Sequence, residues 1–463
     1  MEFPLCVAQL KRTGPKLLIV VSLCSVFIWF QSTRQYSSGG TKLKTASAPL
    51  AFSENHNIHP IVQKDISSNS TAANFFQLLA SIDRKKESPT SLIELFVPYL
   101  IKEPVEPIDE SCNPEPLPHV SDNLCVGDFN KNAFTGKLRE KPVKTIVHSV
   151  KFSFEVDVLE IHLNELYDVV DYFFIVESVN AHADSSPKPL LWEFVKNQPR
   201  FKKFEKKIVR FILDDSSVTL PSPDFGIWIP ERREEVIRWE KIKQWLDHYE
   251  LSSDALIGFG DGDEITSRHL VHRMRYCELK KEVFDIGMLF SFGNLEKAYN
   301  AGYLSLNYGF SGATFWTYDA ATKPSQFHSI QKLKTYPTYR RSKNLDAALF
   351  GGDHLSDEMY LPFILTKMIT KSSGNSLQGD FYPTLDKLNY SPELPVEELN
   401  LRLMKAIDSR THRKFGPRQK KIEKVLAENP ESYKPMFQIP WFLTCNLQRY
   451  PAWSFKYDLR LSD

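Results

Sequence analysis

The sequence predicts an α/β domain with a mainly parallel sheet. Its short apolar runs have the length and composition of buried strands, at residues 146–150, 172–176, 208–213, 255–259 and 283–292. Segments with apolar residues at helical spacing separate several of these runs, at residues 158–170 and 231–249. Strand, helix and strand in that order form a right-handed parallel unit, whose ligands bind beyond the carboxyl ends of the strands. Acidic residues that follow those ends are therefore the first site candidates.

An acidic turn, Asp261-Gly262-Asp263-Glu264, follows the apolar run at residues 255–259. Two carboxylates around a glycine suit a hard divalent cation, Mn²⁺ or Mg²⁺, that is held by one or two carboxylates and keeps other positions open for a diphosphate. We predict a metal site at Asp261 and Asp263, with Glu264 orienting them or a metal-bound water. The alternative is a solvated acidic turn. The spacing of an EF-hand calcium loop is missing.

Two more stretches supply site candidates. Glu177 ends the run at residues 172–176, so it is expected beside the acidic turn at the same edge of the sheet. A basic stretch at residues 332–343, which includes Arg340, has the charge to face a diphosphate. The alternatives are a surface acid after a strand and a solvated basic surface.

Residues 346–357, DAALFGGDHLSD, repeat the pattern of an apolar run that ends in glycine and acid. We predict that a strand ends at the two glycines and that His354 after them contacts a metal or a phosphate. The alternative is a structural histidine.

Composition and charge bound the function. The chain has 463 residues, of which 42% are hydrophobic, so it is long enough to bury one large core or two modest ones. The formal net charge is +1 and the basic residues are spread among acidic ones, which excludes a general nucleic-acid partner.

The N-terminal region predicts a membrane anchor. Residues 17–30 are apolar and uncharged and follow Lys11, Arg12 and Lys16, which keep residues 1–16 cytoplasmic. A cleaved signal peptide is the competing interpretation. We expect a partly disordered stem over residues 31–110 and a lumenal domain over residues 111–463. Two helix-like patches at residues 75–101 either pack on that domain or form part of the stem.

Four cysteines lie in the expected lumenal domain, without the close paired spacing of a zinc site. In an oxidising lumen we expect disulfides between Cys112 and Cys125 and between Cys277 and Cys445, although four cysteines allow three pairings.

Four motifs resemble glycosyltransferase family 17, the family of the β-1,4-mannosyl-glycoprotein 4-β-N-acetylglucosaminyltransferase. They are VDVLEIHLNELYDVVDYFFIVES at residues 156–178, Lys188-Pro189-Leu190, DGDEI from Asp261, and FGGDHLSD at residues 350–357. The resemblance covers residues 144–455. The chain departs from the family pattern at Thr266, where proline is usual, and at Asp353, where tryptophan is expected.

This resemblance implies a GT-A-like, Rossmann-type nucleotide-sugar-binding domain on a type II anchor in the Golgi membrane. It implies transfer of GlcNAc from UDP-GlcNAc, with Mn²⁺, to a β-linked mannose of a glycoprotein N-glycan, as in bisecting-type processing. Glu177, Asp261 and Arg340 would contact the nucleotide.

Inversion at the anomeric carbon needs one general base for the acceptor hydroxyl. Asp353 and Asp357 are the candidates for that base, beside His354 in the same motif. Three other functions are compatible with the same groups: a membrane-tethered carbohydrate-binding or scaffold protein without turnover, a hydrolase of nucleotide sugars, and a transferase with a different donor or acceptor.

Overall fold

The structure is a computed structural model of the chain. It describes residues 75–83, 86–126, 133–182, 186–214, 229–249, 251–292, 311–322, 348–356, 360–370, 381–388 and 438–454. Single residues and short stretches are also described at 295, 297–298, 391, 394–395, 398–399, 401–402, 405, 416–420, 423, 456 and 458–461. The expected tail, anchor and most of the stem lie outside these residues. No helix in the described part of the chain is long and apolar enough to cross a membrane.

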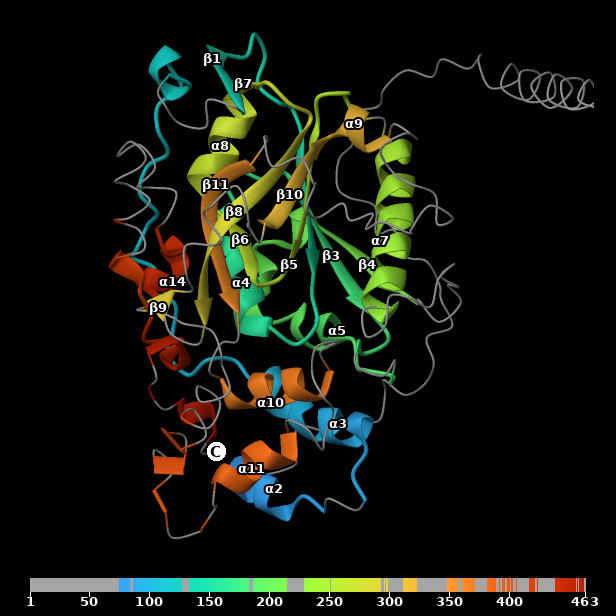
Figure 1. The fold of residues 1–463 in the computed structure, drawn as a ribbon, viewed down its shortest axis with the longest axis vertical. Coiled ribbons are helices and arrows are strands. Elements are labelled where there is room, and N and C mark those ends of the chain that lie inside the picture. The colour runs from blue at the N-terminus through green and yellow to red at the C-terminus, as the bar shows by residue number, and fades with distance from the viewer. Residues whose placement is uncertain are drawn as a thin grey trace, which may run out of the picture. The chain divides into compact units, whose positions relative to one another are not determined.

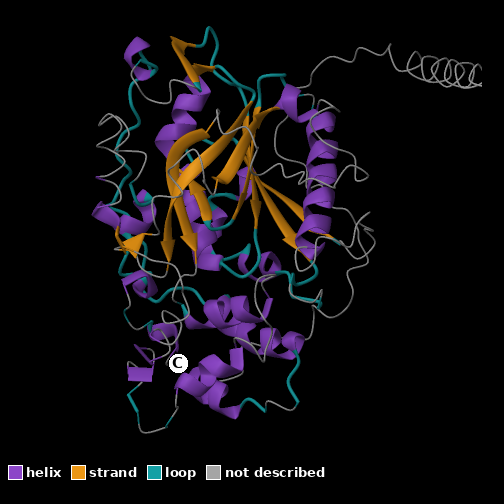
Figure 2. Ribbon diagram, in the orientation of Figure 1, coloured by secondary structure: helices purple, strands orange, loops and turns teal. Residues whose placement is uncertain are grey.

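The main sheet has ten strands within the described residues, in the order β12-β9-β8-β10-β5-β2-β3-β4, with β11 paired to both β8 and β6 (Figures 1 and 2). Its strands are β2 (Ile146–Lys151), β3 (Tyr172–Ser178), β4 (Ile208–Leu213), β5 (Leu256–Asp261), β6 (Glu264–Thr266), β8 (Val283–Phe292), β9 (Lys297–Ala298), β10 (Ser311–Thr317), β11 (Ala348–Ser356) and β12 (Gly416–Pro417). A separate antiparallel pair is formed by β1 (Phe134–Leu138) and β7 (Cys277–Leu279).

The strand directions confirm a mostly parallel sheet, with an antiparallel insertion. β4, β3, β2 and β5 are parallel neighbours, and β11 is parallel to β8. Between these two groups lies β10, which is antiparallel to both β5 and β8. The apolar runs predict where strands lie, but they carry no information on direction, so the place of β10 was not predicted.

Helices cover both faces of the sheet (Figure 2). Those described are α2 (Phe75–Ser81), α3 (Pro89–Leu100), α4 (Val156–Leu166), α5 (Leu191–Val195), α6 (Pro199–Lys202), α7 (Ile229–His248), α8 (Arg268–Tyr276), α9 (Tyr318–Thr322), α10 (Leu361–Thr370), α11 (Tyr382–Leu388) and α14 (Trp441–Cys445). Side chains alternate between the faces of a strand. In β2, Ile146 and Val150 accordingly join the core on the α4 side, whereas Val147 joins the one under α7.

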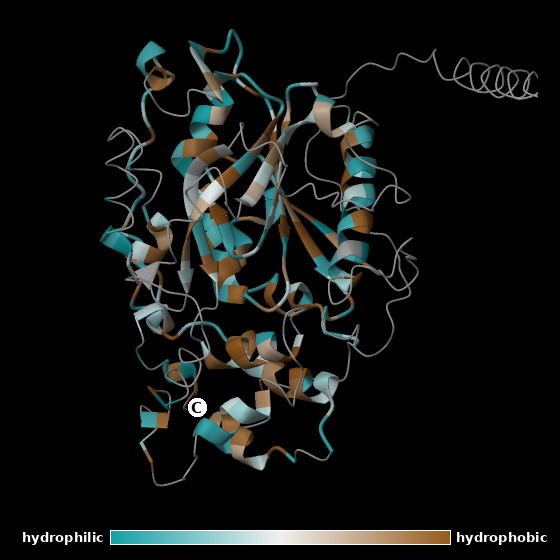
Figure 3. Ribbon diagram, viewed as in Figure 1, coloured by the Kyte–Doolittle hydropathy of each residue, from teal (hydrophilic) through white to brown (hydrophobic). Residues whose placement is uncertain are grey.

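The helix α7 is amphipathic, as predicted. Its residues Trp239, Ile242 and Leu246 are buried against Phe174 and Phe259 of the sheet. Figure 3 shows the alternation of hydrophilic and hydrophobic patches along this helix. Burial of that apolar stripe fixes α7 across the parallel strands.

Every residue of α4 is buried, including its acids. Asp157 pairs with Arg200 and Arg460, at 2.7 Å to each, and Glu160 pairs with Arg200 and Arg449, at 3.1 and 3.2 Å. These pairs explain how acidic residues are tolerated inside the core. The acids of the first family motif therefore hold α6 and the C-terminal segment onto α4.

The patches at residues 75–101 form α2 and α3, which pack on the domain beside α10 and α11 (Figure 1). The ring of Phe96 contacts those of Phe75 and Phe381, and the hydroxyl of Tyr360 donates to the carbonyl of Tyr99 at 2.7 Å. Of the two alternatives for these patches, packing on the main domain is the one observed. The folded unit thus includes part of the segment predicted as stem.

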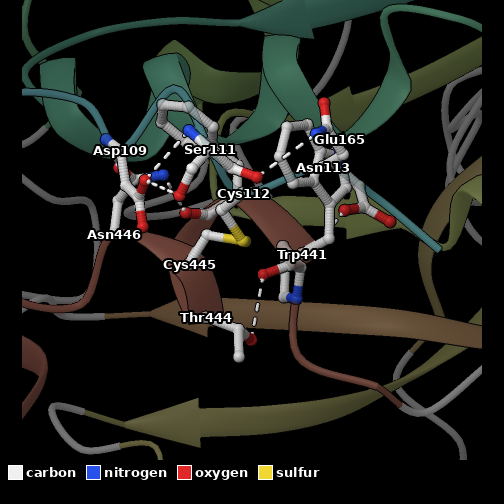
Figure 4. The surroundings of a disulfide bond; sticks show 11 residues. Asp109, Ser111, Cys112, Asn113, Glu165, Trp441, Thr444, Cys445 and Asn446 are labelled. Carbon is white, nitrogen blue, oxygen red and sulfur yellow. Dashed lines mark hydrogen bonds between the residues drawn. A yellow bond between two sulfur atoms is a disulfide. The ribbon is translucent and has the colours of Figure 1, made fainter.

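The cysteine pairing expected from the sequence is wrong. The disulfides join Cys112 to Cys445 and Cys125 to Cys277, with Cα–Cα distances of 5.8 and 5.5 Å. Figure 4 shows the first of them, where the amide of Asp109 donates to Oδ1 of Asn446 at 2.7 Å. The paired cysteines come from distant segments that tertiary packing brings together. Their separation along the chain therefore does not predict which cysteines pair.

Candidate active site

The strand order reverses between β2 and β5. From β2 the chain moves through β3 to β4 on one side, and α7 then returns it to β5 on the other side. Ligands of α/β sheets bind at the carboxyl ends of the strands where such a reversal occurs. The last residues of the two strands, Lys151 and Asp261, are register partners at this point. The structure therefore places the predicted acidic turn at the expected ligand position.

Backbone and side-chain hydrogen bonds hold the acidic turn. The amide of Gly262 donates to the carbonyl of Lys151 at 2.8 Å, and the amide of Asp261 donates to Oε2 of Glu264 at 3.0 Å. Nδ1 of His162 in α4 lies 2.9 Å from the carbonyl of Gly262. Glu264 is fully buried, so its placement suits orientation of the turn.

The missing side chain of Gly262 makes room for an acid that was not predicted. A Cβ at this position would lie 2.6 Å from Oε1 of Glu155. The oxygens of Glu155 accept the amides of Ser153 and Phe154, at 3.2 and 2.9 Å. Burial and the charge of Asp263 raise the pKa of Glu155. The available signal was its place between the end of β2 and the start of α4.

The motif FGGDHLSD at residues 350–357 reaches the acidic turn because most of it lies in β11. That strand continues through its glycines to Ser356, so the strand end predicted at Gly351-Gly352 is wrong. Gly352 has φ +138° and a Cβ there would lie 2.4 Å from the carbonyl of Ile265. Glycine thus permits β11 to pair with β6, which aligns His354 with Glu264.

His354 lies beside Asp263, and its predicted contact with a metal or a phosphate stays a prediction. Its Nε2 is 3.3 Å from Oδ2 of Asp263, and Nζ of Lys367 in α10 is 3.4 Å from the same oxygen. Burial raises the pKa of Asp263, but His354 and Lys367 lower it more, to about 2. The carboxylate is therefore ionised at neutral pH.

Asp353 has a different environment from the one expected of a general base. Its side chain is fully buried, and both oxygens face the guanidinium of Arg418, with Nη1 at 2.8 Å from Oδ1. The hydroxyl of Ser291 donates to Oδ1 at 3.1 Å. This is the geometry of a structural ion pair. Asp357 and Arg340, the other candidates, lie outside the described residues.

Glu177 lies at the predicted edge but is fully buried. Its Oε1 accepts the amide of Trp192 at 3.1 Å, and its Oε2 accepts Nε and Nη2 of Arg210 at 3.1 and 2.9 Å. Both oxygens thus hold α5 and β4 in place. A nucleotide contact by Glu177 stays a prediction.

A group of charged residues beside the turn was missed by the sequence interpretation. Nζ of Lys151 lies 3.2 Å from Oε2 of Glu234 in α7 and 3.9 Å from Oδ1 of Asp261. Nε2 of His182 also contacts Oε2 of Glu234. Burial raises the pKa of Glu234, but Lys151 and His182 lower it more. The sequence signal that could have identified this group is Lys151, which ends the apolar run at residues 146–150.

The carboxylates of the acidic turn fit a cation that the protein binds through only one or two side chains. Among the described residues no group of three His, Cys, Asp or Glu side chains is arranged to hold a metal ion. Mg²⁺ and ions like it need only one or two carboxylates when substrate phosphates supply further oxygens. Asp261 and Asp263 meet that requirement, with side chains 29% and 15% exposed.

No curated protein matches the chain at a significant level. Residues 107–296 match the family model described as glycosyltransferase family 17. The matched range includes α4, β2 to β8 and the acidic turn, and it ends before β11. The match to glycosyltransferase family 17 is thus shown for residues 107–296, which hold three of the four motifs that predicted this family, at residues 156–178, 188–190 and 261–265.

Proposed function

We propose that this glycosyltransferase is a metal-dependent inverting enzyme that moves GlcNAc from UDP-GlcNAc to a β-linked mannose of a glycoprotein N-glycan. The family segment supports the reaction class. The observation that carries the proposal is the position of Asp261 and Asp263 at the carboxyl end of β5, where the strand order reverses.

In this proposal Asp261 and Asp263 hold Mn²⁺ or Mg²⁺ on the diphosphate of the donor. The cation, when bound, supplies positive charge to the departing diphosphate. Glu264 and His162 keep the turn in shape through the amide of Asp261 and the carbonyl of Gly262. His354 orients the carboxylate of Asp263 through its Nε2.

The general base is proposed to take the proton from the acceptor hydroxyl. The ion pair with Arg418 occupies both oxygens of Asp353. Of the two acids in the motif, Asp357 is therefore our proposed base.

We also propose that residues 17–30 anchor the chain in the Golgi membrane, with the catalytic domain lumenal. The two disulfides support an oxidising compartment, because such bonds are rare in cytosolic proteins.

The test is release of UDP from a panel of UDP-sugars, or of GDP from a panel of GDP-sugars, by the purified full chain, with and without Mn²⁺ and with and without a free N-glycan acceptor. Asp263→Asn removes the charge and keeps the shape. Asp247→Asn is the matched control, because this exposed acid contacts Tyr318 near the amino end of β5.

Turnover of UDP-GlcNAc that needs the metal, Asp263 and the acceptor supports the proposal. Release of free GlcNAc without acceptor favours a hydrolase instead. Folded protein that binds a glycan but turns over no donor favours a carbohydrate-binding protein. Preference for another sugar would keep the transferase and change its donor.

A further inference from the structure

Lys188 follows β3 at the edge of the sheet that carries the acidic turn. Its amide donates to the carbonyl of Val179 at 2.9 Å, and Asn180 pairs with Pro187 in an antiparallel bridge. These contacts fix the backbone of Lys188 next to the carboxyl end of β3. Lys188-Pro189-Leu190 is also one of the motifs that resemble the family.

The ammonium group of Lys188 is buried without a hydrogen-bond partner. The residue is 7% exposed, and Nζ has no acceptor among the described residues. It lies 5.2 Å from the centre of the Phe154 ring. An ammonium has three N–H donors, and leaving them unsatisfied in a buried position is unfavourable. This side chain is therefore suited to an acceptor that the described residues do not supply.

The carboxylates around Lys188 already accept hydrogen bonds or ion pairs from other groups. Glu177, Glu234 and Glu155 are the carboxylates whose charge acts on it. Glu177 binds the Trp192 amide and Arg210, Glu234 contacts Lys151 and His182, and Glu155 accepts two backbone amides. Burial lowers the pKa of Lys188, and the three acids raise it without reversing that shift. Their fields only partly compensate the buried charge.

Lys188 and the acidic turn have neighbours in common. Glu234 feels the charges of both Lys151 and Lys188, and Lys151 is 3.9 Å from Asp261. Phe154, which lies under Lys188, directly precedes Glu155, which abuts Gly262. Two ammonium groups are thus grouped around Glu234, next to the proposed metal carboxylates. A diphosphate has many acceptor oxygens and the matching charge.

We propose that Lys188, together with Lys151, binds the diphosphate of a nucleoside diphosphate sugar. This inference deepens the proposed function and rests on it. The alternative is a purely structural lysine, compensated by the Phe154 ring and the field of the three acids.

The two interpretations differ in the response of stability to ligand. The experiment uses the full chain and measures thermal unfolding and calorimetric binding with UDP plus Mn²⁺, with inorganic pyrophosphate plus Mn²⁺, and with uridine. Lys188→Met removes the buried charge and keeps most of the volume. Lys196→Met is the control, because this lysine of the same region is 42% exposed and pairs with Glu193.

For a diphosphate ligand we expect Lys188→Met to unfold, without ligand, at or above the wild-type temperature. Its affinity for UDP and for pyrophosphate should fall by about 10- to 100-fold. Uridine binding should not change, and Lys196→Met should behave as wild type. Lys188→Arg, which keeps a cation, should recover part of the lost affinity.

Equal stabilisation of wild type and Lys188→Met by UDP and by pyrophosphate overturns the inference and leaves the proposed function intact. If Lys188→Met does not fold, Lys188→Gln and Lys188→Arg are compared, and equal affinity in both overturns it. Binding of pyrophosphate that depends on Lys188, without turnover of any nucleotide sugar, supports the anion site and overturns the proposed function. Failure of wild type to bind any diphosphate overturns both.

Discussion

Nε2 of His354 in β11 lies 3.3 Å from Oδ2 of Asp263, which lies in the turn between β5 and β6. The contact exists because β11 pairs with β6, directly after the acidic turn. The amide of Leu355 reinforces it by donating to the carbonyl of Asp263 at 2.7 Å. The motif at residues 350–357 therefore supports the acidic turn, because its strand β11 is paired with β6.

Replacing His354 should reduce turnover more than stability. His354→Gln removes the imidazole that orients Asp263, and loss of a partner behind a metal-binding carboxylate typically lowers activity or metal affinity by about 10- to 100-fold. UDP release as a function of Mn²⁺ concentration measures the effect. The exposed His248→Gln is the control. Unchanged Mn²⁺ dependence and unchanged turnover in His354→Gln would show that the contact is incidental.

Adding one methyl group at Gly352 should destabilise the fold. Gly352→Ala places a Cβ at φ +138°, only 2.4 Å from the carbonyl of Ile265. We expect a loss of about 1–3 kcal/mol in the free energy of unfolding, measured in urea. Gly136→Ala is a matched control, since Gly136 has φ +87° but its nearest contact would be at 3.9 Å. An equal loss in both variants would mean that the clash with β6 is relieved.

Breaking the buried pair of Asp157 and Arg460 should destabilise the protein without changing the turnover of folded molecules. Asp157→Asn leaves Arg460 and Arg200 with less compensation in the core, and such a change costs about 3–5 kcal/mol. Urea denaturation measures this loss. Turnover per folded molecule should stay at the wild-type value. A specific loss of turnover in folded Asp157→Asn would instead give the first family motif a catalytic part.

His162 should lose its contribution to stability between about pH 6.5 and 4. Burial lowers the pKa of His162 from its ordinary value to about 4, so the unfolded chain binds a proton there that the folded chain does not. The contribution of His162 to stability is therefore full above pH 6.5 and falls as the pH falls toward 4. Each such histidine contributes up to about 1.4 kcal/mol per pH unit. His148 is shifted in the same direction, again chiefly by burial.

Urea unfolding at pH 7 and pH 5 checks this dependence. His162→Gln should show a smaller difference between the two pH values than wild type, whereas the exposed His248→Gln should keep the wild-type difference. The same difference in His162→Gln and wild type would place the responsible group elsewhere.

The sequence alone determined the strands and helices of the parallel core. The run at residues 283–292 is a strand over the predicted range, and β5 ends at Asp261, where the turn begins. Such elements are readable because hydrophobic periodicity is local. For the same reason the sequence placed Asp261 and Asp263 at a strand end.

Tertiary structure alone decided which partners the charged residues and cysteines have. Asp353 was expected at the chemistry and is paired with Arg418, whereas Glu155 and Lys188 were given no role and lie around the turn. The disulfide between Cys112 and Cys445 spans 333 residues, and no local pattern encodes it. Charge and sulfur chemistry depend on which side chains meet in space. That depends on how the whole chain packs, and hydrophobic spacing carries no information about it.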